Sequence, residues 1–121
     1  MTGWVDANGR SWLSITVQNP WTGASQQFDV CVDPAFEGEL ALPLAQIQGL
    51  ELRGSMNIIT AVLADGSQVK LDAYTCLVPW FGVLRQIECL AKVSLLPLLG
   101  IGLLQSHILT IDYPALTVTL T

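Results

Sequence analysis

The chain has 121 residues, of which 51% are hydrophobic and only 12% are charged. This length predicts a single domain, residues 1–121, and so low a charge content favours burial of apolar surface against a second copy of the chain. A net charge of −5, without a cluster of Lys or Arg, argues against nucleic acid and anionic membranes as partners.

The three cysteines, Cys31, Cys76 and Cys89, are widely spaced and odd in number, which is typical of neither a disulfide framework nor a metal site. Each lies in an apolar context, so we expect buried free thiols in a reducing compartment. The N-terminus lacks the pattern of a signal peptide, and the longest apolar run, residues 93–104, is too short to span a bilayer. We therefore expect a soluble, cytoplasmic protein without a metal or another cofactor.

The first half of the chain reads as short strands joined by turns. Residues 1–10 contain the tight-turn dipeptide Asn8-Gly9 and are predicted to form a small hairpin or a loose lead-in. Residues 11–17 alternate apolar and polar side chains, which predicts a half-buried strand. The segments that follow are predicted as a turn at 19–23, strands at 26–32 and 40–42, helical turns at 44–48 and an extended piece at 50–53.

The second half continues in the same way. Its strongest signal is Asp65-Gly66, a hairpin dipeptide between strands predicted at 55–63 and 68–78. Further segments are predicted as a turn at 79–82, a strand with two mixed faces at 83–91, a loop at 94–97, a short helix at 101–105 and strands at 108–112 and 116–120. Many short strands with regular turns and two brief helices indicate an all-β domain.

One stretch places a carboxylate between two apolar strands. Residues 28–32 alternate as a buried strand that ends at Asp33, and residues 40–42 form the next strand. A charged group in such a place is costly unless something compensates it. Two interpretations are open: Asp33 caps the turn by accepting hydrogen bonds from the amides of Ala35 or Phe36, or it is a catalytic carboxylate within reach of substrate.

The same stretch resembles the active-site segment of retropepsin-like aspartic proteases, especially a small prokaryotic branch with the pattern Asp-Thr-Gly-Phe-x-Gly-x-Leu-x-Leu-Pro. Residues 33–43 read Asp-Pro-Ala-Phe-Glu-Gly-Glu-Leu-Ala-Leu-Pro, so the pattern matches in register except at its Thr and first Gly. A second family element, two apolar residues and a glycine before a short helix, matches Leu98-Leu99-Gly100. The resemblance covers most of the chain, from near Trp12 to the C-terminus.

This resemblance implies a closed acid-protease β-barrel with one or two short helices, and an aspartic endopeptidase in which Asp33 is catalytic. Aspartic proteolysis needs two carboxyl groups that share one proton, so that one acts as a base towards water and the other as an acid. Because the chain has one such segment, the second Asp33 is expected from a second copy in a homodimer. By the same resemblance, Pro34, Ala35 and Phe36 are expected to contact a peptide or protein substrate.

Two further positions gain a role from the resemblance. The residues Ala64, Asp65, Gly66 and Ser67 fall where the family has its flap, a hairpin that closes over substrate, although an ordinary hairpin has the same signal. Gly100 matches the glycine that lets the preceding strand pass close behind the Asp33 loop. Ile101 and Gly102 stand where retroviral members carry the residues that brace their dimer.

The resemblance fails at Pro34 and Ala35. In the family, the Thr hydroxyl reaches the partner loop across the dimer axis, and Pro34 has neither a hydroxyl nor a backbone N–H. Ala35 keeps the amide that the family's Gly offers to the carboxylate. The alternative function is therefore a catalytically inactive relative that serves as a peptide-binding or dimerisation module.

The remaining polar residues are predicted to be structural. His107, the one histidine of the sequence, is expected to cap a helix end rather than to act as a base. Asp112 is expected to cap a turn. Glu37 and Glu39 are expected to face solvent, which is usual for glutamates that flank a glycine in a loop.

Overall fold

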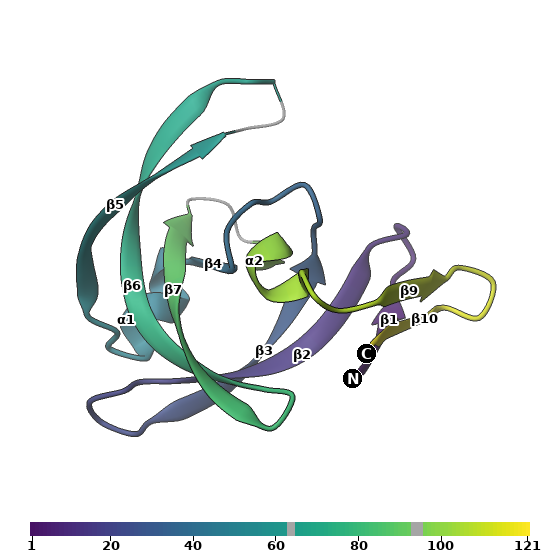
Figure 1. Ribbon diagram of the computed structural model, residues 1–121, viewed down its shortest axis with the longest axis horizontal. Coiled ribbons are helices and arrows are strands. Elements are labelled where there is room, and N and C mark those ends of the chain that lie inside the picture. The colour runs from purple at the N-terminus through teal and green to yellow at the C-terminus, as the bar shows by residue number, and fades with distance from the viewer. Residues whose placement is uncertain (63–64, 93–95) are drawn as a thin grey trace.

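The computed structural model describes residues 1–62, 65–92 and 96–121, and strands dominate it (Figure 1). None of the helices in these residues is long and apolar enough to cross a membrane. In chain order the elements are β1 (Thr2–Val5), β2 (Ser11–Gln18), β3 (Ser25–Val32), β4 (Leu40–Pro43), α1 (Leu44–Gly49), β5 (Gly54–Val62), β6 (Gln68–Trp80), β7 (Val83–Lys92), β8 (Leu98–Leu99), α2 (Ile101–Leu104), β9 (Leu109–Asp112) and β10 (Thr117–Leu120).

The strands form one sheet that closes on itself. Their order is β5-β6-β7-β4-β8-β3-β2-β1-β10-β9, and β2 pairs a second time, with β6, where Gln18 lies opposite Leu77. The six strands from β6 to β2 therefore make a ring, from which β5 extends at one end and β1, β10 and β9 at the other (Figure 1). This architecture confirms the predicted all-β, barrel-like fold with two short helices.

Alternate side chains of the strands fill the inside of the ring, as the two-residue period of a strand requires. In β2, Leu13, Ile15 and Val17 are buried, and Leu13 pairs with Val30 of β3 while Ile15 pairs with Phe28. The other elements add the fully buried side chains Leu40, Leu42, Ile47, Cys76, Val78, Cys89, Leu99, Leu103, Val118 and Leu120. The strand face predicted for residues 11–17 is thus the core face.

The cysteines are buried and free, as the sequence predicts. Burial raises the pKa of Cys76 to about 12, and it raises the pKa of Cys89 as well. Both thiols therefore stay neutral and unreactive in the folded protein near neutral pH.

A second, smaller cluster lies on the opposite face of the sheet. Ala41 and Leu90, which pair between β4 and β7, alternate with neighbours that face the core, so their side chains point to the outer face. The buried members of this outer cluster are Ala41, Ala73 and Leu90, and the partly buried side chains on it are Phe36, Leu71 and Leu98. Because Phe36 belongs to the loop after β3, this cluster anchors that loop.

Residues 1–10 supply the first strand and the turn of a hairpin with β2, so they are not a loose lead-in. The carboxylate of Asp6 organises it: Oδ1 accepts the amides of Asn8 and Arg10, each at 2.9 Å, and Oδ2 accepts the indole N–H of Trp12 at 2.8 Å. These bonds, led by that of Trp12, hold the pKa of Asp6 below its usual value. The hairpin places β1 between β2 and β10.

Two predicted boundaries are wrong. Pro79 and Trp80 continue β6, and the chain reverses at Phe81 and Gly82, whose φ angles are 50° and 80°. Two consecutive residues with positive φ form the kind of two-residue turn that matches the twist of a hairpin. The turn predicted at 79–82 is therefore shorter, and Trp80 pairs with Val83.

The segment 50–53 was predicted to be extended, but Leu50 and Glu51 form a turn. The turn completes the end of α1, where the amide of Leu50 donates to the carbonyl of Gln46 at 3.2 Å and that of Glu51 to Gln48 at 3.0 Å. The buried side chain of Asn19 adds two bonds, from its amide to the carbonyl oxygens of Leu50 at 2.9 Å and Glu51 at 3.1 Å. Local and distant bonds together hold this turn, where Glu51 takes a φ of 55°.

Candidate active site

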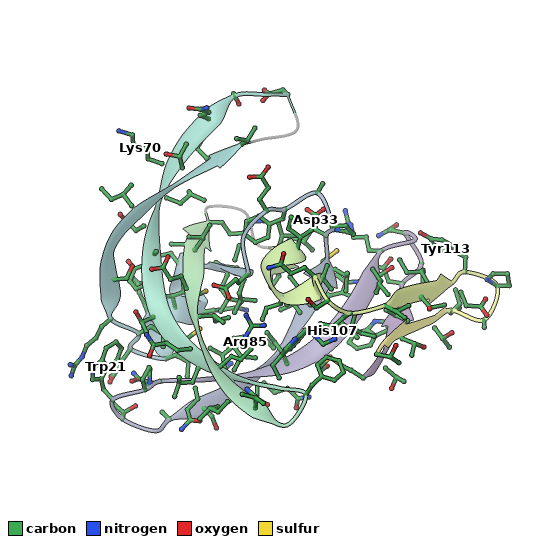
Figure 2. All side chains as sticks on the ribbon, in the orientation of Figure 1. Trp21, Asp33, Lys70, Arg85, His107 and Tyr113 are labelled. Carbon is green, nitrogen blue, oxygen red and sulfur yellow. The ribbon has the colours of Figure 1, made fainter. Side chains whose placement is uncertain are left out.

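Asp33 lies directly after β3, at the rim of the ring and on the side towards which the β5–β6 hairpin extends (Figure 2). Its backbone amide donates to the carbonyl of Leu99 at 2.9 Å, so its main chain is held by β8. Its carboxylate Oδ1 accepts the amide of Ala35 at 3.0 Å, and its carbonyl accepts the amide of Phe36 at 3.1 Å. The turn-capping bond that the sequence predicts is therefore present, on a partly exposed carboxylate.

Strand β8 and helix α2 fix the loop that follows Asp33. β8 lies between β3 and β4, parallel to the first and antiparallel to the second. Immediately after it, three successive amides donate to carbonyl oxygens of the loop: Gly100 to Glu39 at 3.0 Å, Ile101 to Phe36 at 2.9 Å and Gly102 to Gly38 at 3.0 Å. We call these three bonds, together with the bond from Asp33 to Leu99, the loop clamp.

The clamp requires a glycine at residue 100. A Cβ atom there would lie 2.2 Å from the carbonyl oxygen of Gly38 and 2.6 Å from that of Phe36, both of which are main-chain atoms. Separations this short force the backbone to move. The predicted close approach of this segment to the Asp33 loop is confirmed.

Pro34 and Ala35, where the sequence departs from the family pattern, are both exposed. Pro34 cannot donate a main-chain hydrogen bond, and Ala35 supplies the one amide bond to the Asp33 carboxylate that the residues described here contain. The exchange of Gly for Ala thus keeps the carboxylate–amide bond. The side chain of Phe36 is partly buried against the outer cluster.

The charge of Asp33 acts on two neighbours. Burial lowers the pKa of Lys92, and attraction by Asp33 opposes this effect. Burial raises the pKa of the Cys31 thiol, and repulsion by Asp33 adds to it. Asp33 therefore has a partly buried ammonium group and a neutral thiol within its electrostatic range.

The predicted flap residues lie in the turn of the β5–β6 hairpin, apart from Ala64, which is outside the described residues. Oδ1 of Asp65 accepts the amide of Ser67 at 2.9 Å and its hydroxyl at 2.6 Å, and Gly66 has a φ of 85°. These bonds, led by that of the Ser67 hydroxyl, lower the pKa of Asp65. Within the described residues, no hydrogen bond joins this exposed turn to the Asp33 loop.

The prediction that Glu39 faces solvent is wrong, whereas Glu37 is exposed as expected. The Glu39 carboxylate accepts the amide of Glu88 at 3.3 Å and lies 3.6 Å from the guanidinium of Arg85. Burial raises the pKa of Glu39, although the Glu88 amide and Arg85 oppose the shift. Sequence patterns gave no signal for this pair, because Arg85 sits in a strand with two mixed faces.

The prediction for Asp112 is confirmed, whereas the prediction for His107 is wrong. Asp112 caps its turn as predicted, by accepting the amide of Ala115 at 3.0 Å. The side chain of His107 does not cap α2; its Nε2 accepts the indole N–H of Trp80 at 3.1 Å, and its ring stacks on Phe81 with 4.3 Å between centroids. His107 thus ties the segment after α2 to the β6–β7 hairpin and takes no part in the Asp33 site.

No protein-family model matches this chain, and no curated protein matches it in sequence. Among solved structures, it is similar to the crystal structure of a retropepsin-like aspartic protease from Rickettsia conorii, with a TM-score of 0.65 and 16% sequence identity. The alignment covers 99% of this chain and 88% of that chain. At this level of identity the likeness concerns the fold, and the chain therefore has a retropepsin-like fold.

Proposed function

We propose that this protein is an aspartic endopeptidase of the retropepsin type, in which Asp33 from each of two copies acts on one peptide bond. Two carboxyl groups held a few ångströms apart cannot both ionise, so they share one proton. The ionised carboxylate takes a proton from water as that water attacks the peptide carbonyl, and the neutral carboxyl acts as the acid. The chemistry needs no metal or organic cofactor.

The observation that carries the proposal is the loop clamp around Asp33. A carboxylate that only tied off a turn would need its bond to the Ala35 amide and nothing more. Asp33 also has its main chain bonded to Leu99, and the loop beyond it accepts three amides from the start of α2. Catalysis depends on placing the reacting group within a fraction of an ångström, which is what such a clamp supports.

The proposed partner is a second copy of this chain. Around Asp33 the single chain exposes apolar side chains, namely Pro34, Ala35 and Ile101, the last with 38% of its surface accessible. A two-fold contact places the same residue of each copy opposite itself at the axis, so a contact through this face would bring two Asp33 carboxyl groups together. The chain supplies one loop of this kind, and the second carboxyl group requires the dimer.

The proposed substrate is an extended peptide segment bound beneath the β5–β6 hairpin. Main-chain hydrogen bonds to such a hairpin hold a peptide largely independently of its sequence. In this proposal the turn residues Asp65, Gly66 and Ser67, together with Ala64, form the flap, and Pro34, Ala35 and Phe36 contact the substrate beside Asp33. Closure of the hairpin would exclude water other than the attacking molecule.

Cleavage of a peptide library from acidic to neutral pH tests this function, with and without a pepstatin-type inhibitor. The key variant is Asp33→Asn, and Asp112→Asn is its matched control, because the Asp112 side chain also accepts a main-chain amide in its own turn but has no part in the proposed site. We expect Asp33→Asn to lower the rate about a thousandfold or more, and Asp112→Asn to retain most of it. Persistent cleavage by Asp33→Asn would contradict the proposal.

The double variant Pro34→Thr with Ala35→Gly addresses the departure from the family pattern. Pro34 cannot form the hydroxyl bridge across the axis, so the natural protein is expected to be slower than this variant. If cleavage appears in the variant and is absent from the natural protein, which nevertheless binds peptide, the protein is the inactive relative rather than the enzyme.

A further inference from the structure

Glu39 joins three elements at the far end of the Asp33 loop. Its carbonyl accepts the amide of Gly100 at 3.0 Å, which ties it to the start of α2. Its carboxylate reaches the other way: Oε1 accepts the amide of Glu88 at 3.3 Å, and Oε2 lies 3.6 Å from Nη2 of Arg85. Main chain and side chain of one residue thus connect the loop, α2 and β7.

The carboxylate of Glu39 continues the pairing between β4 and β7. The two strands run parallel, and their register begins with Leu40 opposite Cys89. Glu39 precedes the first of these residues, and the amide that it accepts belongs to Glu88, which precedes the second. A side-chain oxygen therefore takes the place of a main-chain carbonyl and extends the hydrogen-bonding of the strands to the end of the loop.

The ion pair is partly shielded from water. The side chains of Glu39 and Arg85 have relative exposures of 28% and 39%. Arg85 alternates along β7 with Ile87 and Cys89, which face the core, and Figure 2 shows it within the ring. A partly buried carboxylate is costly without a partner, so Arg85 and the Glu88 amide are needed to keep Glu39 ionised in this place.

Gly102 provides the space for this side chain. A Cβ atom on Gly102 would lie 2.5 Å from Cγ of Glu39 and 3.1 Å from its backbone nitrogen. Because residue 102 has no side chain, α2 can lie against Glu39, and the amide of Gly102 can donate to the carbonyl of Gly38. The close packing of α2 against the Asp33 loop and the Glu39 side chain therefore depends on glycine at residue 102.

We propose that Glu39 and Arg85 are positioning residues for Asp33: their ion pair anchors the end of the Asp33 loop to β7 and thereby fixes where the Asp33 carboxylate stands. This rests on the proposed function, because the position of that carboxylate matters for rate only if Asp33 reacts. Neither residue touches substrate in this account. Their effect is transmitted through the loop clamp.

Amide hydrogen exchange on the full-length chain tests the proposal without requiring activity. The variants are Arg85→Met, which removes the charge, and Arg85→Lys, which retains it; Arg53→Met is the matched control, since Arg53 lies over the ring of Trp21 instead. We expect Arg85→Met to speed exchange at Ala35 and Phe36 about tenfold or more, with little change at Asn19. Lysine should restore part of the protection, and Arg53→Met should change neither site.

Kinetics provide the second readout. If the chain is a peptidase, Arg85→Met should lower kcat about tenfold to a hundredfold with a smaller rise in KM, because the loop carries Asp33 and some of the proposed substrate contacts, whereas the contacts of the flap remain. Arg85→Lys should recover much of kcat. A wild-type chain without activity whose loop still loosens in Arg85→Met would support the anchoring role and overturn the peptidase.

The proposal is overturned if exchange at Ala35 and Phe36 is unchanged in Arg85→Met, or if exchange rises equally at every amide, which would mean a loss of global stability alone. Glu39→Gln keeps the test decisive if Arg85→Met does not fold. Glutamine can still accept the Glu88 amide but cannot pair with Arg85, so it too should loosen the loop selectively.

Discussion

Asp33 and Asp65 occupy turns that are locally almost the same. In each turn, Oδ1 of the aspartate accepts the amide of the residue two positions later, at 3.0 Å for Asp33 and 2.9 Å for Asp65. Within the described residues, the other bond to the Asp65 carboxylate is also local, from the hydroxyl of Ser67. Asp33 has one further local bond, from the amide of Phe36 to its carbonyl, but its main chain and the loop beyond it also bond to β8 and the start of α2, which lie far away in the sequence.

The difference shows that a capped aspartate does not by itself make a site. Asx-type turns form wherever a chain reverses, because the bond lies within a few residues. A reactive carboxylate must also be kept in one place relative to its surroundings, and that requires contacts from outside the turn. The loop clamp supplies such contacts to Asp33, and nothing equivalent surrounds Asp65 in the part of the chain that the structure describes.

The largest expected effect comes from adding one methyl group beside the Asp33 loop, at Gly100, and comparing it with one added in the Asp65 turn, at Gly66. Gly100→Ala places a Cβ atom against main-chain oxygens of the loop and should lower the free energy of unfolding by about 3 kcal/mol. Gly66→Ala meets open space and suffers only from its positive φ, so it should lower that free energy by about 1 kcal/mol. Urea unfolding of both variants measures the difference, and equal effects would mean that the clamp is not tight.

The second effect uses Cys31 as a reporter of the clamp. Residue Cys31 is 8% exposed, and its amide donates to the carbonyl of Pro97, next to β8. If Gly100→Ala loosens β8 from β3, Cys31 should be alkylated about tenfold faster than in the natural chain. Mass spectrometry of the alkylated peptides gives the rate for each thiol. Cys76, which is fully buried, should stay unreactive, and faster labelling of both thiols would indicate general unfolding instead.

A third, smaller effect concerns the pH dependence of stability at Glu39. Burial raises the pKa of Glu39 above its ordinary value of 4.5. The folded state therefore binds the Glu39 proton more tightly than the unfolded chain does. The contribution of Glu39 to the free energy of unfolding is complete below that value and is lost as the pH rises through the pKa of the folded state. Glu39→Gln does not titrate, so its free energy of unfolding relative to the natural chain should improve between about pH 4 and about pH 7. Denaturant unfolding at several pH values checks this, and a difference that does not vary with pH contradicts it.

The smallest effect is expected at Asp65, whose side chain is fully exposed. Its pKa is lowered below the ordinary value of 3.8, so its contribution is present above that value and is lost as the pH falls through the pKa of the folded state. Asp65→Asn should therefore flatten the acid limb of the stability curve slightly. Thermal unfolding at low pH measures it, and a loss as large as that of Gly100→Ala would remove the contrast between the two turns.

Much of the fold could be predicted because its signals are local. The alternation in residues 11–17 identified a strand and its buried face, and the Ala35 amide bond to Asp33 spans only two positions. The errors arose where contacts from outside a segment contribute. At Leu50, bonds from the end of α1 turn the chain, and the side chain of Asn19, 31 positions upstream, adds a further bond that no pattern in residues 50–53 records.

The candidate site shows the same division. Asp33, its capped turn and the need for Gly100 were accessible from the sequence, since a matching pattern extends along residues 33–43 and returns at 98–100. The pairing of Glu39 with Arg85 was not, because it exists only once β4 lies beside β7 and α2 covers the junction. Glu39 becomes partly buried only when the ring of strands closes, and the sequence around Glu39 carries no sign of this burial.

The most direct test of the proposed function is the distance between spin labels attached at residue 35 in the variant Ala35→Cys, measured by pulsed dipolar spectroscopy. The natural cysteines are buried, so the label should attach to the introduced thiol, and Thr22→Cys in the exposed turn before β3 serves as the matched control. We predict a single short distance for residue 35 and a longer one for residue 22, because the proposed dimer brings two Asp33 loops together at its axis. Absence of dipolar coupling at residue 35, or a shorter distance at residue 22, would contradict the account.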